Sequence, residues 1–154
     1  MNYREYREVK QKSFNELPIF FAFGMRQFKE AMEERGLTEK DTDKIYSLGA
    51  GGYYLRSDAP LIRAWFSKKD ELPELMKNYE FAEDAFFYEM KNHEFGINSQ
   101  GDWDVCSCFG DCEYDDSKGG DEYLRDMGYG ESTVNAYHGA KARYFRAALD
   151  NDWF

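Results

Sequence analysis

Hydrophobic positions in the first part of the chain recur at helical spacing on either side of a short apolar run. Residues 2–11 place an apolar side chain at about every third position among charged ones, which predicts a short amphipathic helix. Residues 19–23 are continuously apolar and β-prone, which predicts a buried strand. Residues 24–36 again show a one-sided helical pattern, and we expect Gly36 to end that helix.

Two further helices and a hairpin follow in the pattern. Residues 44–56 read as two short β-segments, and the glycines at 49–52 form a tight turn between them. A phosphate-binding loop is disfavoured there, because strand-like tyrosines follow the glycines where a helix would be required. Residues 57–66 and 70–78 are predicted to form short helices.

The second half contains the two most regular helical patterns. Residues 79–93 and 131–154 both carry a continuous apolar face, and Ser132 or Thr133 is predicted to cap the second helix. Between these helices, residues 94–98 are predicted to form a short strand.

The elements together predict an α+β fold, a single compact domain over residues 1–154 in which five or six helices pack on a small β-sheet. Aromatic residues make up 18% of the chain, which favours an aromatic-rich core. Residues 98–122 contain four glycines and no periodicity, and are predicted to be a long acidic, cysteine-containing loop or insertion. No apolar run reaches the length of about 20 residues needed to span a membrane. The charged start and the odd number of cysteines lead us to expect a cytoplasmic protein with reduced thiols.

Charge changes this picture because it is concentrated in one segment. The formal net charge is −10, and residues 97–131 hold ten acidic and two basic side chains. A field of this sign repels nucleic acid and favours basic partners. The simpler alternative is that the acidity only keeps the protein soluble.

The three cysteines give the segment a second possible chemistry. Cys106, Cys108 and Cys112 are soft ligands, and His138 or His93 could complete a zinc site. The spacing differs from the paired cysteines of common zinc motifs, so zinc is an alternative and the primary expectation is no cofactor. The other interpretation of the cysteines is that they are small, partly buried reduced residues.

Calcium binding and catalysis are less consistent with the sequence. A calcium loop beginning at Asp111 would need glycine where Asp116 stands. His93 and His138 belong to no recognisable nucleophile motif, and a histidine at a helix end commonly interacts with the helix dipole. We therefore expect a protein that is not an enzyme.

Three short stretches carry a family resemblance. Ser13 to Phe23, the turn from Gly49 to Gly52, and Asn92 to Phe95 resemble uncharacterised small acidic proteins of phages and mobile elements of gut Firmicutes. The similarity covers about residues 1–97 and stops before the cysteine-bearing segment. It brings no catalytic residues with it, and it implies a mobile-element setting in which small acidic proteins inhibit host defence.

The expected function is therefore inhibition of a bacterial defence nuclease, of the anti-CRISPR or anti-restriction type. The chain would bind a basic, nucleic-acid-binding protein by occlusion or nucleic-acid mimicry, without binding nucleic acid or membranes itself. The alternative is a zinc-stabilised accessory or interaction domain. The expected contact carboxylates all lie in the acidic segment: Asp102, Asp104, Asp111, Glu113, Asp115, Asp116, Asp121 and Glu122.

Overall fold

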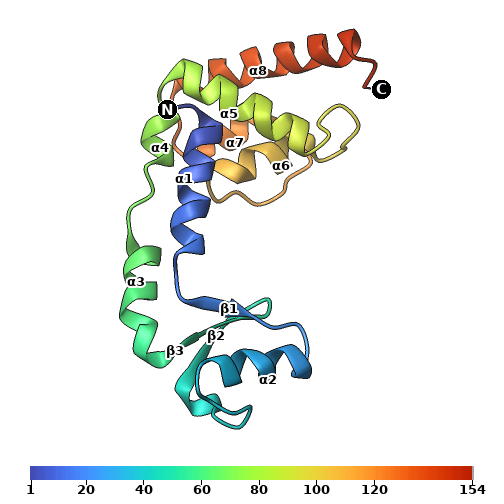
Figure 1. Ribbon diagram of the computed structural model, residues 1–154. Coiled ribbons are helices and arrows are strands. Elements are labelled where there is room, and N and C mark those ends of the chain that lie inside the picture. The colour runs from blue at the N-terminus through green and yellow to red at the C-terminus, as the bar shows by residue number, and fades with distance from the viewer. Residues whose placement is uncertain (154) are drawn as a thin grey trace. The chain divides into compact units, whose positions relative to one another are not determined.

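The computed structural model describes residues 1–153 and has the expected α+β composition, with one small antiparallel sheet (Figure 1). Within the chain, contacts are concentrated in two compact units. We call Glu8–Lys69 the insert unit, and we call Met1–Arg7 together with the residues from Asp70 onward the helical unit. Helix α1 (Tyr3–Asn15) belongs to both, because its first residues lie in the helical unit and the rest in the insert unit.

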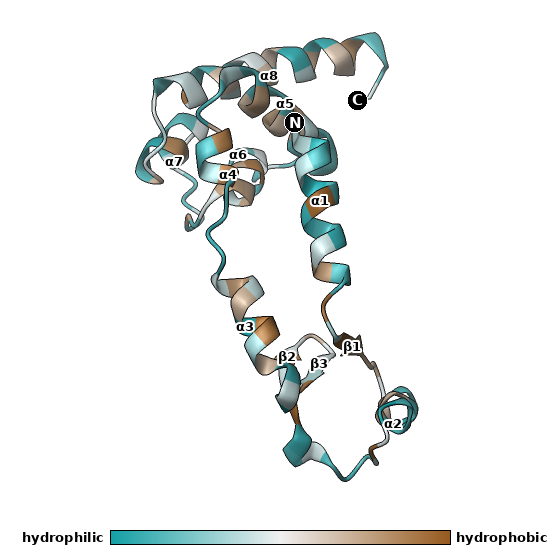
Figure 2. Cartoon of the chain, turned by 60° about the vertical axis from the view of Figure 1, so that its left-hand side comes forward, coloured by the Kyte–Doolittle hydropathy of each residue, from teal (hydrophilic) through white to brown (hydrophobic). Residues whose placement is uncertain are grey.

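The sheet of the insert unit has three strands in the order β1-β3-β2, and both pairs are antiparallel. The strands are β1 (Ile19–Phe21), β2 (Ile45–Gly49) and β3 (Gly52–Leu55). Strand β1 is hydrophobic along its whole length, as its brown colour in Figure 2 shows. The structure therefore confirms the three predicted strand regions of this unit.

The glycine-rich turn joins β2 to β3, as predicted. Gly49 pairs with Gly52, so that Ala50 and Gly51 form the turn. Ala50 and Gly51 both have positive φ angles, 48° and 80°. Two-residue hairpins favour this backbone, because its twist matches that of the flanking strands.

A small hydrophobic core holds the helix α2 (Met25–Glu34) against the sheet. Phe20, Met32 and Ile45 are its buried members. Gly36, at a φ of 72°, follows the helix, and the next amide, of Leu37, donates to the carbonyl of Met32 at 2.9 Å. This is the glycine-dependent helix ending that the sequence predicted.

Helix α3 (Ala59–Ser67) completes the insert unit after the short 3₁₀ turns η1 (Thr42–Lys44) and η2 (Arg56–Asp58). The Trp65 indole donates to the Ser13 hydroxyl at 3.1 Å and packs edge-on against Phe14. These contacts tie α3 to the last turns of α1.

The helical unit contains five α-helices besides the start of α1, and the described chain therefore has more helices than the five or six expected. They are α4 (Leu72–Leu75), α5 (Tyr79–Asn92), α6 (Gly101–Cys106), α7 (Gly120–Asp126) and α8 (Glu131–Asp150). The core between α5 and α8 is aromatic, as expected: the rings of Phe86 and Tyr137 meet edge to face at 5.2 Å.

Two of the segments predicted in this unit differ from the structure. Residues 94–98 form turns and no strand, and the positive φ of Glu94 (51°) is incompatible with an extended chain. The predicted loop at 98–122 contains α6, the 3₁₀ turn η3 (Ser107–Phe109) and the start of α7. Val105 and Phe109 are buried in the main core, and their burial gives these short helices the stability that their sequence lacks.

The predicted cap of α8 is also wrong. Gly130 occupies the capping position, and Ser132 and Thr133 lie inside the first turn. Their hydroxyls donate to carbonyls just after α4 instead, from Ser132 to Lys77 at 3.3 Å and from Thr133 to Met76 at 2.7 Å.

Among the described residues, no helix combines the length and apolar character needed to cross a membrane.

Candidate functional site

A buried carboxylate, Glu89, lies at the centre of a polar network in the helical unit. Its side chain is 1% exposed, on the face of α5 that points into the core. One carboxylate oxygen, Oε1, accepts from the Arg7 guanidinium at 2.6 Å and from the Tyr3 hydroxyl at 3.2 Å. Both donors come from the start of α1, so the charge of Glu89 is compensated by a cation from a distant part of the sequence.

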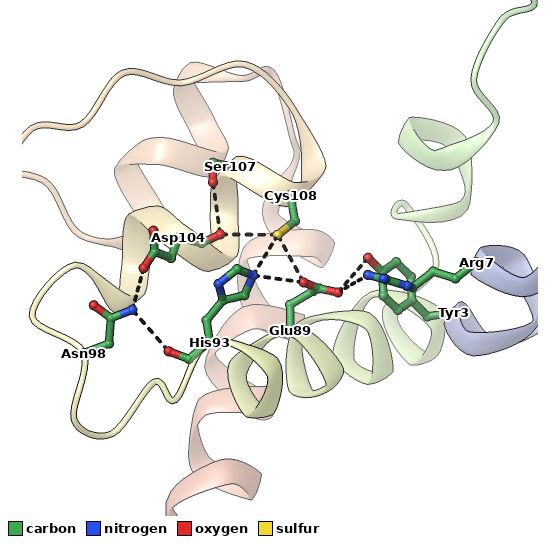
Figure 3. A network of polar contacts seen from close by, with 8 residues as sticks. All are labelled: Tyr3, Arg7, Glu89, His93, Asn98, Asp104, Ser107 and Cys108. Carbon is green, nitrogen blue, oxygen red and sulfur yellow. Dashed lines mark hydrogen bonds and ion pairs between the residues drawn. The ribbon is translucent and has the colours of Figure 1, made fainter. Parts of the chain in front are cut away.

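The other oxygen, Oε2, contacts a histidine and a cysteine. The His93 Nε2 atom lies 3.2 Å from Oε2, and the Cys108 thiol donates to the same oxygen at 3.2 Å. Cys108 Sγ and His93 Nε2 are themselves 3.5 Å apart. Figure 3 shows the three side chains meeting, and we call them the Glu–His–Cys cluster.

The local helices explain why these side chains meet. Glu89 lies in the last turn of α5 and His93 caps its C-terminal end four residues later, which places the two side chains on the same side of the helix. Cys108 follows α6 in η3, and its thiol also lies 3.3 Å from the Asp104 carbonyl. The Asn98 amide donates to the His93 carbonyl at 3.1 Å and fixes the turn that connects α5 to α6 (Figure 3).

The protonation of Cys108 limits what the cluster can do unaided. Burial, and then the hydrogen bond to Glu89, raises the pKa of the Cys108 thiol to about 12. A nucleophilic cysteine requires the opposite shift, toward the thiolate near neutral pH. The arrangement therefore stabilises a hydrogen-bonded thiol, whereas a bound metal ion would stabilise the thiolate.

The four predicted zinc ligands do not converge. The Cys106 thiol is buried and contacts the Gly120 carbonyl at 3.8 Å, and His138 is an exposed residue that pairs with Asp121 at 2.8 Å. Within residues 1–153, the group of three or more metal-binding side chains that the structure brings together is Glu89, His93 and Cys108, whose ligand atoms all lie within 4.8 Å of one another. Cys108 is shared with the predicted set, as is His93, the alternative to His138 as fourth ligand, whereas Cys112 lies elsewhere and lines the hollow described next.

Glu89 was not among the site residues expected from the sequence, and His93 was expected only as a possible fourth zinc ligand. The signal was available in part, because a Glu and a His four residues apart on a convincing helix share a face. The approach of Cys108 depends on the turn after α5 and on α6, neither of which was predicted.

A second feature is a surface hollow of about 420 Å³ in the helical unit. We call it the acidic hollow, because five carboxylates and a single lysine are among its lining residues. The charged residues that line it are Asp111, Glu113, Asp115, Asp116, Asp126 and Lys118. It thus contains four of the eight carboxylates predicted to contact a partner.

The remaining four predicted carboxylates have other positions. Asp102 accepts a hydrogen bond from the Tyr137 hydroxyl, and Asp104 accepts one from Asn98 at 2.5 Å. Asp121 pairs with His138, and Glu122 is an exposed residue of α7. The carboxylates of Asp102 and Asp104 therefore take part in bonds within the fold.

Internal bonds also involve part of the acidic hollow. The Asp115 carboxylate accepts from the backbone amide and hydroxyl of Ser117, at 2.9 and 2.6 Å, and these bonds lower the pKa of Asp115. Lys118 pairs with Asp126 at 2.9 Å. Asp111, Glu113 and Asp116 remain as exposed carboxylates.

Comparison with known proteins gives a family without a known role. No curated protein and no solved structure matches the chain. Residues 2–110 match a family of unknown function, DUF7659. The matched region extends beyond residue 97, where the resemblance seen in the sequence ended. It includes every residue of the Glu–His–Cys cluster, and it stops before the residues that line the acidic hollow. Because the match covers most of its length, the chain belongs to the DUF7659 family.

Proposed function

We propose that this protein is a binding protein for a basic protein surface, and that its target is a bacterial defence nuclease, such as a CRISPR nuclease or a restriction enzyme. The observation that carries the proposal is the acidic hollow, which is lined by five carboxylates and one lysine. The protein would act by binding and not by catalysis, and in the cytoplasm, where such nucleases work.

The shape and charge of the hollow fit a basic side chain. An arginine or lysine that entered a hollow of about 420 Å³ would lie among several carboxylates, and charge-assisted hydrogen bonds of this kind are among the strong ones. The net charge of the surrounding segment would also steer a basic partner toward it at a rate that falls with salt.

A nuclease is the preferred partner class for a chemical reason. A nucleic-acid-binding groove is lined by lysines and arginines that neutralise phosphates. Carboxylates presented along a surface can occupy such a groove in place of the phosphates, and the resemblance to mobile-element proteins supports a target in host defence. The same negative charge disfavours direct binding of nucleic acid by this chain.

A charge-reversal experiment tests the proposal. In the test variant, the exposed carboxylates of the hollow are replaced: Asp111→Lys, Glu113→Lys and Asp116→Lys. The matched control carries Glu33→Lys, Glu34→Lys and Asp43→Lys, which reverse three exposed carboxylates of the insert unit. Both variants change the net charge equally, so that they differ only in where on the protein the three charges are reversed.

Binding to purified CRISPR-associated and restriction nucleases is measured at low and high salt, together with nuclease inhibition. We expect the test variant to lose at least about tenfold in affinity, and the control to lose much less. The proposal is wrong if no nuclease is bound or inhibited, if binding is insensitive to salt, or if both variants lose affinity equally.

A further inference from the structure

We infer that the Glu–His–Cys cluster is a binding site for a single Zn²⁺ ion, in which Cys108 Sγ, His93 Nε2 and Glu89 Oε2 are the protein ligands. This site is separate from the acidic hollow, and of the ligands expected from the sequence it contains Cys108 and His93, the alternative to His138, but neither Cys106 nor Cys112.

The distances between the three ligand atoms are those of a tetrahedral zinc site. Zinc bonds of about 2.3 Å to sulfur and about 2.0–2.1 Å to nitrogen or oxygen imply sulfur–nitrogen and sulfur–oxygen separations near 3.5 Å, and a nitrogen–oxygen separation of about 3.3 Å. The observed sulfur–nitrogen, sulfur–oxygen and nitrogen–oxygen distances are 3.5, 3.2 and 3.2 Å. The side chains therefore need only small movements to coordinate an ion placed between them.

The sulfur and nitrogen ligands determine which metal ions the site favours. A thiolate and an imidazole favour zinc and similar transition metals, whereas magnesium and calcium prefer oxygen alone. On binding, the ion replaces the thiol proton of Cys108, which passes to solvent, and forms a bond to the resulting thiolate.

The residues around the cluster orient the ligands as in known metal sites. Arg7 and Tyr3 hold Oε1 of Glu89, which leaves Oε2 directed at the histidine and the cysteine (Figure 3). Ligating carboxylates are commonly fixed by such outer hydrogen bonds. The buried Glu89 is thus positioned before the metal arrives.

The site also has an entry path and an open position. The His93 side chain is 32% exposed, so an ion can reach the cluster from solvent on that side. Three protein ligands leave the fourth tetrahedral position for water or for a group of another molecule.

The test uses the full chain, purified with a chelator and a reductant and then titrated with Zn²⁺ or with Co²⁺ as a spectroscopic probe. We expect one zinc ion per chain, a rise in Tm, and a thiolate-to-cobalt charge-transfer band with tetrahedral d–d bands. Cys108→Ser and His93→Gln should each weaken zinc binding at least tenfold, and the first should abolish the charge-transfer band. Cys112→Ser and His138→Gln, which change residues outside the cluster, should leave both the zinc affinity and the charge-transfer band unchanged.

A second measurement keeps the inference testable if a variant fails to fold. Thiol alkylation of the unmodified protein, with and without zinc, is mapped by mass spectrometry, and zinc should protect Cys108 but not Cys112. The inference is overturned by the absence of stoichiometric zinc binding, by a charge-transfer band that survives Cys108→Ser, or by zinc protection of Cys112 in place of Cys108.

Discussion

Glu89 and Tyr137 are buried polar side chains that the fold satisfies in different ways. The Glu89 carboxylate is matched by a cation, Arg7, and by hydrogen-bond donors. The Tyr137 hydroxyl donates to the Asp102 carboxylate, while its ring packs against Phe86 in the core. Burying such groups without partners would cost several kcal/mol, so both sets of contacts are needed for stability.

Replacing Tyr137 by phenylalanine should change both the stability and its dependence on pH. Burial, followed by the negative groups around it, raises the pKa of Tyr137 above its usual value of about 10. The folded state therefore favours the neutral hydroxyl, and the stability that this group contributes is complete below pH 10 and is lost as the pH rises further. We expect Tyr137→Phe to cost about 1.5–3 kcal/mol at pH 7 and to make the loss of stability above pH 10 less steep.

Denaturant unfolding of both proteins between pH 7 and pH 11 measures this difference. Equal slopes above pH 10 in the two proteins would show that Tyr137 does not titrate as its surroundings predict. The comparison with the variant isolates the contribution of Tyr137, because all other titratable groups are the same in both proteins.

Single residues of the candidate sites were predictable to different degrees. Glu89 and His93 share a face of a helix that the hydrophobic pattern predicts, so their proximity follows from spacing alone. The acidic segment was recognisable from its charge, but charge does not distinguish a carboxylate such as Asp102, which accepts an internal hydrogen bond, from an exposed one such as Asp111. That distinction depends on tertiary contacts.

At the scale of elements, the start of α8 is joined to the residues just after α4 by the side chains of Ser132 and Thr133. Serine and threonine at the start of a helix commonly cap it, but here they do not. Thr133 is 1% exposed, and its hydroxyl donates to the Met76 carbonyl. The neighbouring Ser132 makes a longer bond to Lys77 at an exposed position. Buried hydrogen bonds of this kind satisfy carbonyls that the end of a helix leaves unpaired.

Thr133→Val should therefore destabilise the protein by about 1–3 kcal/mol, since valine keeps the volume but leaves the buried Met76 carbonyl without its donor. Ser132→Ala is the matched control and should cost less than about 0.5 kcal/mol, because water can replace the exposed hydroxyl. Equilibrium denaturation gives both values. Equal effects of the two substitutions would contradict the assigned role of Thr133.

The elements that were predicted correctly are those with strong patterns of their own. Helices α5 and α8 have continuous apolar faces, and the hairpin has a glycine turn with positive φ angles. Helix α6 has six residues, too few for a periodic signal, and it is stabilised by burial of residues such as Val105. A prediction from local pattern therefore fails where tertiary contacts stabilise the element.

At the scale of the whole molecule, the contact between Arg7 and Glu89 joins positions separated by 82 residues. Arg7→Met should destabilise the protein by about 2–4 kcal/mol, because it leaves a buried carboxylate without its cation. Adding Glu89→Gln to this variant should restore part of the loss, since the neutral amide needs no counter-charge. A double-mutant cycle measured by denaturant unfolding gives the coupling, and purely additive effects would show that the ion pair does not contribute to stability.

The family match ends within the helical unit, between the residues that carry the two proposals. It includes Tyr3, Arg7 and the Glu–His–Cys cluster, and it ends at residue 110, just before the acidic hollow begins. The proposed zinc site thus rests on the part of the chain that the family model describes, whereas the proposed partner surface rests on residues beyond it. The two proposals can therefore fail independently.

The division of the chain into units also determines the order in which contacts can form during synthesis. The chain leaves the helical unit after Arg7 and returns to it at Asp70, where the Tyr6 hydroxyl donates to the Asp70 carboxylate at 2.6 Å. A ribosome completes the contiguous insert unit, residues 8–69, before it makes Glu89. The hairpin and its small core can therefore fold early, whereas Tyr3 and Arg7 can contact Glu89 only after α5 has emerged from the ribosome. Slowing translation after residue 69 should favour the insert unit as the first structure to form.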